Sequence, residues 1–503
     1  MTSSDVRRLD LNSEYLGVST LQLMENAGRA VAAEVASRFK QGSRILVLAG
    51  TGRNGGDGMV AARHLASMGY DVSLHLVGSE SNIRDRLVSI NWGILKGMSS
   101  SVKLQVFPDS ADFQPLEADV LVDSILGVGL KGSLRQPILG AVRALNRSSG
   151  FIVSVDVPTG VDSDSGEVRG EAVRAQLTVT FHALKAGFAK AKEYVGEVRV
   201  ASIGIPPEAE LYAGPGDVDL IAGRRPSQSR KGDFGRVLVI GGDETYSGAP
   251  ALVALAALRT GTDLAYVAAP ARTAQAISSI SPNLITVKLS GEHFNPDNLA
   301  QLKPLLERVT AVAVGPGMGL SRESCEGVEQ LIRMLEHSRK PALFDADALK
   351  ALGAFKRSLP FPAVLTPHAG EFEALTGVKV SAELEERVGQ VKRLAADAQA
   401  VILLKGRVDI VSDGSRVRLN WTGNPGMTVG GTGDVLSGII ASLIAQGCRP
   451  FEAAVAGAFI NGAAGDFAYR EKGFHLLATD LIDQIPHVMN DPMSHRDAKY
   501  LGG

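Results

Sequence analysis

The sequence has few of the features that direct a protein to a membrane, a nucleic acid or an oxidising compartment. Its 503 residues include two cysteines, Cys325 and Cys448, which lie far apart and form no metal-ligand spacing. We expect reduced thiols and a cytoplasmic location. The first residues lack the basic and apolar regions of a signal peptide. No apolar run reaches the length of a membrane span, so we expect no membrane attachment.

Charge and aromatic content exclude two further classes of protein. The formal net charge is -2, whereas nucleic-acid binders usually carry a basic excess. Aromatic residues make up 5% of the chain, which argues against an RNA-stacking surface. Glycine, in contrast, is abundant, with 56 residues in a chain that is 45% hydrophobic and 21% charged. This composition is typical of a globular protein, and the glycines favour nucleotide-handling loops of an α/β fold.

Short runs of Val, Ile and Leu alternate with helical patterns along the whole chain. Strands that alternate with helices predict parallel sheets covered on both faces, which is an α/β fold. The pattern breaks between residues 204 and 231, where Gly, Pro and Arg are frequent. We therefore predict two α/β domains, 1–212 and 213–503. The runs expected to form buried strands are 44–49, 71–77, 119–123, 151–155, 236–240, 311–314, 342–344 and 401–404.

Glycines and acidic residues follow three of the expected strands in the first half. Residues 46–58 predict a strand and a glycine-rich turn, followed by a helix that begins at Met59. Asp57 follows that turn, and Asp123 and Asp156 end two further strands. The three carboxylates would converge at the crevice where open α/β sheets bind ligands. Each aspartate alone is more often a turn former, but three together favour a binding site.

A second glycine-rich segment, 423–434, leads directly into an apolar stretch of helical character. Backbone N–H groups at such a helix start attract anions, because the helix macrodipole is positive there. Asp434 is expected in the first helical turn, where its charge would repel a phosphate. It is better explained as a base that takes a proton from a hydroxyl attacking the phosphate. The simpler alternative is that Asp434 caps the helix.

Two other polar residues follow expected strands of the second half. His368 stands beside Pro and Gly at a strand end and is expected to face the cleft, although a single histidine is usually structural. Lys405 precedes Gly406 after a buried strand, and it either lies along a nucleotide phosphate or is solvated. Glycines in the segment 315–319 would let a ligand approach the backbone.

Four motifs of the first half resemble those of the NAD(P)H-hydrate epimerase domain, which has a Rossmann-like three-layer fold. They lie at residues 24–30, 54–58, 123–132 and 154–160, and the resemblance covers about residues 1–210. The resemblance implies that Asp156 performs acid/base chemistry at the nicotinamide ring. It also implies a potassium ion near Asn54, Asp123 and Thr159. The substrate-binding residues that it implies are Asn54, Gly55, Gly56, Asp57, Gly127, Val128, Gly129, Leu130, Lys131, Gly132 and Asp156.

The motifs of the second half, in their order, resemble the ADP/ATP-dependent NAD(P)H-hydrate dehydratase, a ribokinase-like α/β fold. This resemblance spans about residues 225–490. It implies that Asp434 is catalytic and that the hydrate contacts Ala249, Gly317, His368 and Asp434. The nucleotide-binding residues that it implies are Lys405, Gly406, Arg407, Val408, Asp409, Gly431, Thr432 and Gly433.

The chain departs from the patterns of these families in three places. Arg53 stands where the epimerase domain usually has a second Asn, and it could add a phosphate contact or alter the pose of the ligand. Thr159 replaces the usual Ser and keeps its hydroxyl. The segment 407–409 stands where the dehydratase often has a small residue and a Thr, which leaves the adenine and ribose contacts open.

Together the two resemblances imply a bifunctional enzyme of nicotinamide nucleotide repair. Hydration adds water across the C5–C6 bond of NADH or NADPH and leaves a hydroxyl at C6 in the R or S configuration. The first domain is expected to interconvert the two forms. The second is expected to dehydrate the S form at the expense of ADP or ATP, giving AMP or ADP and phosphate.

Cofactors and partners follow from the same resemblance. The expected ions are Mg²⁺ and K⁺, and the expected ligands are the hydrates NADHX and NADPHX together with ADP or ATP. We expect a homo-oligomer and no nucleic-acid partner. ADP is the usual donor in prokaryotic members of the family, but the sequence does not separate it from ATP.

Two alternatives remain open from the residues themselves. The second domain could be a ribokinase-like kinase of a vitamin precursor, because the loop that ends at Asp434 serves that chemistry equally well. The turn at Asn54 on the same chain argues against a simple kinase. The chain could also be a binding or scaffold protein, but the presence of both Asp156 and Asp434 argues against that function.

Overall fold

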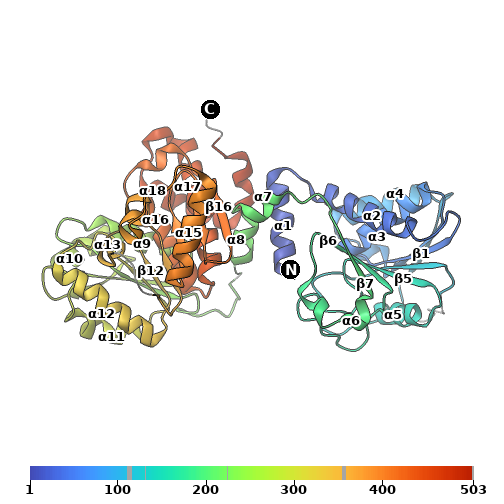
Figure 1. Cartoon of the computed structure of the whole chain (residues 1–503), viewed down its shortest axis with the longest axis horizontal. Helices are drawn as coiled ribbons and strands as arrows, with labels where there is room; N and C mark the ends of the chain where they lie inside the picture. The colour runs from blue at the N-terminus through green and yellow to red at the C-terminus, as the bar shows by residue number, and fades with distance from the viewer. Residues whose placement is uncertain (110–115, 131, 222, 224, 354–357, 501–503) are drawn as a thin grey trace. The chain divides into compact units, whose positions relative to one another are not determined.

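The chain divides into two compact units, Met1–Pro206 and Pro207–Gly503 (Figure 1). The computed structural model describes residues 1–109, 116–130, 132–221, 223, 225–353 and 358–500. No helix among these residues is both long and apolar enough to cross a membrane. Each unit is built around a sheet of its own.

The first unit contains a parallel sheet of seven strands within the described residues, in the order β3-β2-β1-β4-β5-β6-β7. The order reverses between β1 and β4, which is where open α/β sheets form a crevice at the carboxyl ends of the strands. The strands are β1 (Arg44–Ala49), β2 (Asp71–Val77), β3 (Val102–Phe107), β4 (Val120–Ser124), β5 (Phe151–Val155), β6 (Leu177–Phe181) and β7 (Glu197–Ala201).

Helices cover both faces of this sheet (Figure 1). Successive side chains of a strand point to opposite faces, so Val47 joins the core beneath α2, α3 and α4, and Leu48 joins the core beneath α5. The helices of the unit are α1 (Ser3–Leu16), α2 (Thr20–Ala36), α3 (Arg53–Ser67), α4 (Arg86–Gly97), α5 (Ile138–Arg147) and α6 (Lys192–Val195).

The second unit contains a nine-stranded sheet within the described residues, in the order β10-β9-β8-β11-β12-β13-β14-β15-β16. Pairing is parallel from β10 to β14, and β15 and β16 add an antiparallel edge. The strands are β8 (Arg236–Ile240), β9 (Leu264–Pro270), β10 (Ile285–Leu289), β11 (Ala311–Val314), β12 (Ala342–Phe344), β13 (Ala363–Leu365), β14 (Val401–Leu404), β15 (Asp409–Ser412) and β16 (Val417–Asn420).

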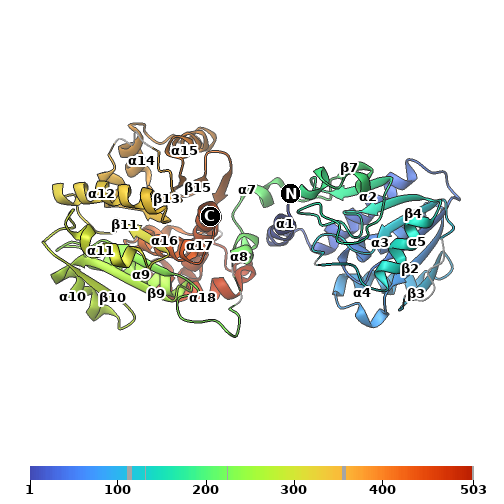
Figure 2. The ribbon, with the colours of Figure 1, turned by 90° about the horizontal axis from the view of Figure 1, so that it is seen from below.

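Helix α16 (Thr432–Ala445) lies at the centre of the second unit (Figure 2). Its residues from Val435 to Ala445 are all buried, and it packs against β8, β11 and β12 as well as α9 and α17. A helix that is apolar all round belongs in a core. The other helices are α9 (Gly248–Arg259), α10 (Ala271–Ile280), α11 (Asn298–Leu306), α12 (Arg322–Ser338), α13 (Asp347–Ala351), α14 (Ala369–Thr376), α15 (Leu384–Ala398), α17 (Pro450–Lys472) and α18 (Ala478–Asn490).

Two short helices, α7 (Pro207–Leu211) and α8 (Pro215–Ile221), begin the second unit. Between them Tyr212 forms a bridge with Leu419 of β16, and the backbone N–H of Ala213 donates to the Leu419 carbonyl at 2.8 Å. Arg418 of β16 also pairs with Asp217 of α8 at 2.7 Å. The boundary predicted at residue 212 therefore falls within a segment whose residues on both sides of the boundary contact β16.

The α/β class predicted from the sequence is confirmed, and the expected strands are present. Seven of them have the expected bounds, and 119–123 is observed as Val120–Ser124. The expected start of a helix at Met59 is wrong, because α3 begins at Arg53. The residues 54–58 therefore lie in the first turns of a helix rather than in a turn before it.

Close packing explains the glycines of α3 better than turn geometry does. A Cβ atom on Gly55 would lie 1.9 Å from the Gly50 carbonyl oxygen, and one on Gly58 would lie 1.9 Å from Ser124 Oγ. A Cβ on Gly56 would lie 2.7 Å from the Met24 side chain. Gly55 and Gly58 let the helix start pack against the carboxyl ends of β1 and β4, and Gly56 lets it pack against α2.

We predict that Gly58→Ala destabilises the first unit and that Gly93→Ala does not. The added methyl at residue 58 must displace the buried Ser124, at a cost of about 1–3 kcal/mol. Gly93 lies on the exposed face of α4 with open space around it, so alanine there stabilises by about 0.5–1 kcal/mol.

The measurement is urea unfolding followed by tryptophan fluorescence. The two tryptophans are Trp92 in the first unit and Trp421 in the second, so a Trp421→Phe background makes Trp92 a reporter for the first unit. Equal midpoints for the two glycine variants would contradict the packing explanation.

Candidate active sites

In the first unit, the Asp123 carboxylate at the end of β4 is fully buried and bound on both oxygens. Its Oδ1 accepts from Thr159 Oγ1 at 2.6 Å, and its Oδ2 accepts from the Thr159 N–H at 2.8 Å and from Ser154 Oγ at 2.9 Å. Burial raises the pKa of Asp123 even though these hydrogen bonds oppose the shift. The structure therefore brings Asp123 and Thr159 into direct contact.

Asn54 lies next to this pair. Its Oδ1 would be 3.0 Å from a Cβ atom on Gly127, so the amide packs against the loop that follows β4. The Asn54 Nδ2 is buried and has no hydrogen-bond partner among the described residues. Thr159 Oγ1 also lies 3.2 Å from the carbonyl oxygen of Leu126, the residue before Gly127. Oxygen ligands of this kind fit a hard cation, whereas the unpaired Nδ2 is a donor and suits an acceptor atom of a bound ligand.

The loop after β4 contains the other residues of the first unit that the sequence predicts to contact a substrate. Val128 packs against the small core that contains Val157 and Phe188, whereas Gly129 and Gly132 have φ values of 94° and 82°. These left-handed conformations favour glycine. Leu130 is partly buried, and Lys131 lies outside the described residues.

Asp156 follows β5 in a strained conformation with φ of 63°, which is uncommon for a residue other than glycine. Its Oδ1 lies 2.7 Å from the ammonium of Lys185 and accepts from Thr180 Oγ1 at 3.1 Å and from the Phe181 N–H at 3.2 Å. Asp156 is 7% exposed and Lys185 is 3% exposed. The expected acid/base residue is thus held by a buried ion pair.

Other charged residues lie around Asp156. Burial raises the pKa of Asp57 well above its usual range, and the charges of Asp156 and Asp10 add to the effect. Burial, opposed by Arg53, raises the pKa of Asp10 to about 6. Arg53 pairs with Asp85 at 2.9 Å and lies 3.9 Å from Asp10. Two carboxylates therefore hold the guanidinium of Arg53, the residue at which this chain departs from the family pattern.

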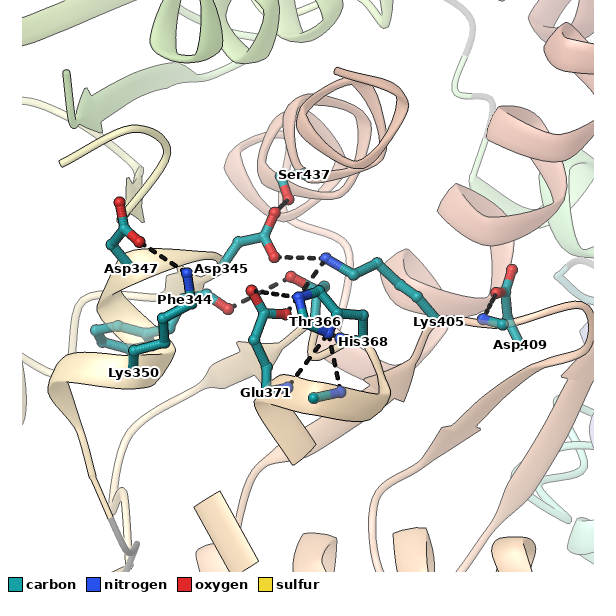
Figure 3. Close-up of polar contacts among 12 residues, drawn as sticks. Phe344, Asp345, Asp347, Lys350, Thr366, His368, Glu371, Lys405, Asp409 and Ser437 are labelled. Atoms are coloured by element: carbon teal, nitrogen blue, oxygen red, sulfur yellow. Dashed lines mark hydrogen bonds and ion pairs between the residues drawn. The ribbon is translucent and has the colours of Figure 1, made fainter. Parts of the chain in front are cut away.

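In the second unit, Asp345 follows β12 and joins two elements that are distant in the sequence (Figure 3). Its Oδ1 accepts from Lys405 Nζ at 2.8 Å, and its Oδ2 accepts from Ser437 Oγ of α16 at 2.6 Å. Burial would raise the pKa of Asp345, but Lys405 and these hydrogen bonds lower it overall. The alternative that Lys405 is simply solvated does not hold, because its ammonium faces buried carboxylates.

Glu371 and His368 complete this cluster (Figure 3). Glu371 Oε2 lies 3.9 Å from Lys405 Nζ and accepts from the His368 N–H at 2.9 Å. The Nδ1 atom of His368 accepts from the N–H groups of Gly370 and Glu371, so the ring caps α14. The side chain of His368 is nevertheless 56% exposed. It therefore both caps the helix and presents Nε2 beside Glu371.

Asp434 lies in the first turn of α16, whose N-cap residue is Gly431 with φ of 100°. The Asp434 carboxylate makes no hydrogen bond within the described part of the chain, and Gly431 provides no side-chain cap. Burial raises the pKa of Asp434 to about 7, with a further contribution from Asp345 and an opposing one from Lys405. The geometry thus favours a base over a helix cap. A Cβ atom on Gly433 would lie 3.6 Å from Lys405 Nζ, which places the loop beside the cluster.

The expected hydrate contacts Ala249 and Gly317 lie together. A Cβ atom on Gly317, whose φ is 62°, would be 3.4 Å from the Ala249 Cβ and 2.8 Å from the Tyr246 Cβ. Tyr246 is 58% exposed. The two residues therefore lie beside an exposed tyrosine.

The remaining expected nucleotide contacts have partners of their own. Asp409 accepts from the Gly406 N–H and from Asn420, and Figure 3 shows it on the far side of Lys405 from Asp345. Burial raises the pKa of Asp409 to about 6. Arg407 is exposed, whereas the Val408 side chain belongs to the core. Thr432 Oγ1 donates to the Met427 carbonyl at 2.8 Å and so closes the glycine loop.

Several charged residues near the sites were not expected from the sequence. Asp345 and Glu371 lie in segments that end expected strands, so their position after a strand was a usable signal. Lys185 had no such signal, because β6 was not expected and the contact depends on the path of the loop after it. The described residues contain no group of three or more His, Cys, Asp or Glu side chains arranged to hold a metal ion.

Each half of the chain matches a known protein family. The family model described as YjeF-related protein N-terminus matches residues 20–187, and the one described as NAD(P)H-hydrate dehydratase matches residues 237–487. The first unit is Rossmann-like and the second ribokinase-like, as expected. A hypothetical protein of Streptococcus mutans aligns with a TM-score of 0.51 and 26% identity over 56% of this chain and 100% of its own.

Curated relatives match along the whole length. The bifunctional NAD(P)H-hydrate repair enzyme Nnr of Hyperthermus butylicus is 47% identical over 98% of this chain and 93% of its own. The protein of the same name from Pyrobaculum aerophilum is 48% identical over 97% of this chain and 98% of its own. The chain therefore belongs to the family of bifunctional NAD(P)H-hydrate repair enzymes.

Proposed function

We propose that this protein repairs hydrated NADH and NADPH at two separate sites. The first unit interconverts the R and S forms of the hydrate, and the second dehydrates the S form at the expense of ADP or ATP. The observation that carries this proposal is that each unit holds a carboxylate suited to proton transfer at the carboxyl end of its own sheet. These carboxylates are Asp156 and Asp434, and both lie in a chain that matches its relatives from end to end.

Dehydration needs activation because hydroxide is a poor leaving group. Asp434 accepts the proton of the C6 hydroxyl as that oxygen attacks the terminal phosphoryl group of the nucleotide, and AMP or ADP leaves. Phosphate then departs from C6 while C5 loses a proton, and the C5–C6 double bond is restored. Backbone N–H groups of the loop 430–433 stabilise the negative charge that develops on the phosphoryl oxygens.

The carboxylates around Lys405 suit a nucleotide with Mg²⁺. Lys405 lies between Asp345 and Glu371 and provides a positive charge beside the glycine loop. Mg²⁺ in proteins is usually held by one or two carboxylates together with substrate phosphates, and these two residues are the ones that would hold it. Mg²⁺ bound there would neutralise negative charge on the phosphates.

Epimerisation at C6 follows from the position of this carbon next to N1. Loss of the hydroxyl as water lets N1 share its lone pair with C6, and water then returns to the opposite face. Asp156 gives a proton to the leaving oxygen and takes one back from the entering water, so its protonation state is restored at the end of each turnover. K⁺ would be held by Asp123, Thr159, Asn54 and the Leu126 carbonyl, where it would orient polar groups of the substrate.

Recovery of reduced nicotinamide absorbance from a mixture of R and S hydrate tests the proposed function. We expect complete recovery with either ADP or ATP and none without a nucleotide. Recovery that stops at the S fraction would remove epimerisation from the proposal. No recovery with either nucleotide, together with phosphorylation of a small alcohol, would return the second unit to the kinase alternative.

Substitution of the two carboxylates separates the sites. We expect Asp434→Ala to abolish dehydration and leave epimerisation intact, because the base is removed from one unit only. Asp156→Asn should abolish recovery from the R hydrate and leave recovery from the S hydrate unchanged. The interconversion of R and S is followed by chromatography. Loss of both activities in either variant would contradict the two-site proposal.

The raised pKa of Asp434 sets the pH dependence of dehydration. Because the base must be ionised and its pKa is about 7, kcat/KM for the hydrate should rise about tenfold per pH unit below pH 7 and level off above it. Asp347 raises the pKa of Asp434, so Asp347→Asn should move the rise to lower pH. An unchanged profile in that variant would show that another group controls the rate.

A further inference from the structure

Lys185 is the most completely buried cation near the first site. Its side chain is 1% exposed, and its ammonium lies 2.7 Å from Asp156 Oδ1. It also donates to Thr180 Oγ1 at 2.9 Å and to the Phe181 carbonyl at 3.2 Å. All three N–H groups of the ammonium therefore have partners, and the side chain has little freedom to move.

These contacts involve only one of the two carboxylate oxygens of Asp156. Oδ1 receives three donors, from Lys185, Thr180 and the Phe181 N–H. Oδ2 receives none from the described residues. The Asp156 side chain is 10% exposed, so it is not fully enclosed by the core. One oxygen is thus fixed by the protein, and the other is left without a donor from the described residues.

The cost of this arrangement argues against a purely structural role. Burying an ammonium and a carboxylate costs free energy before their attraction is counted, and a well-packed apolar pair is often as stable. Asp156 has a left-handed backbone, and so does His182, with φ of 65°, at the end of the neighbouring strand. Strain of this kind gathers at functional sites.

The loop that carries Lys185 is held in place on both sides. The Ala186 N–H donates to the Met1 carbonyl at 2.9 Å, and the Gly187 N–H donates to the Ser163 carbonyl at 2.8 Å. Ser3 of α1 also binds Asp164 through its backbone N–H and its hydroxyl, each at 2.6 Å. The ammonium therefore projects from a fixed backbone toward Asp156.

We propose that Lys185, together with Thr180, is a positioning residue for epimerisation, a role that rests on the function proposed above for the first unit. Lys185 compensates the charge of Asp156 and holds its Oδ1, so that Oδ2 is the atom that exchanges a proton with the oxygen on C6. Lys185 does not contact the substrate. The proton moves between the C6 oxygen and Asp156 Oδ2, and the ammonium keeps its own protons throughout.

The first test is the kinetics of Lys185→Met on the R hydrate in the full chain. We expect kcat for epimerisation to fall by about 100-fold or more, with KM little changed, because the proton-transfer group is misplaced while the binding surface remains. Dehydration of the S hydrate by the second unit of the same chain should be unaffected, which controls for the folding of that unit. A kcat equal to that of the natural protein would overturn the proposal.

Chemical rescue distinguishes the charge from simple packing. Lys185→Ala leaves a space that ethylammonium or propylammonium can enter, so added amine should restore epimerisation in a concentration-dependent way. The Lys185→Met side chain fills the space, and amine should have no effect on that variant. Restoration of activity by a neutral alcohol of the same size, or by none of these compounds, would overturn the role of the charge.

A pair of threonines on β6 keeps the proposal testable if the lysine variants fail to fold. Thr180 donates to Asp156, whereas the equally buried Thr178 donates to the Val195 carbonyl at 2.7 Å. We expect Thr180→Val to lower kcat by about tenfold and Thr178→Val to leave it unchanged, although both lose a buried hydrogen bond. Equal losses in the two variants would assign Thr180 a structural role only.

These outcomes are separate from the test of the proposed function. If the natural protein does not interconvert R and S, the proposed function of the first unit fails. If it does and the Lys185 and Thr180 variants behave like it, only the inference about positioning fails.

Discussion

Close approach between a helix and its neighbours, which only glycine permits, is the constraint on which both sites depend. In the first unit, the start of α3 approaches the carboxyl ends of β1 and β4 so closely that residues 55 and 58 have no room for a side chain. In the second, a Cβ atom on Gly438 of α16 would lie 2.2 Å from the Val253 carbonyl oxygen of the neighbouring α9. The first of these helices carries Asp57 near its N-terminus, and the second carries Asp434. A larger residue at any of these glycines would move the site rather than only loosen the core.

At the edge of each sheet, a lysine faces a carboxylate of opposite charge. Lys185 faces Asp156 in the first unit, and Lys405 faces Asp345 in the second. In each unit the ammonium lies against a buried carboxylate and compensates its charge. Asp434 has no such partner in direct contact, and its pKa of about 7 reflects that difference. The cluster of the second unit thus contains one carboxylate that is paired with a lysine, Asp345, and a second, Asp434, that is suited to accept a proton.

Much of the fold could be predicted from the sequence, because buried parallel strands appear as unbroken apolar runs such as Arg44–Ala49 and Ala311–Val314. Strand β7 (Glu197–Ala201) was missed because it is partly exposed and carries polar residues, whereas β6 (Leu177–Phe181) is buried but has its apolar run interrupted by threonines. The motifs around Asp123, Thr159 and Asp434 could be found because glycines and acids follow strands at short spacing. Lys185 could not be assigned in this way. Its contact with Asp156 depends on how the loop after β6 returns to the same edge, which local sequence does not encode.

The segment that follows Pro206 covers part of one edge of the second sheet. Strand β16 is the outer strand, and an uncovered outer strand offers unpaired N–H and carbonyl groups to any other extended chain. Tyr212 and Ala213 occupy part of that edge, and Arg418 fastens it to α8 through Asp217. The segment that contains Tyr212 and Ala213 therefore also protects this edge from pairing with other chains. Cleavage after residue 212 would separate Tyr212 from the strand that it protects and would leave the second unit prone to edge-to-edge association.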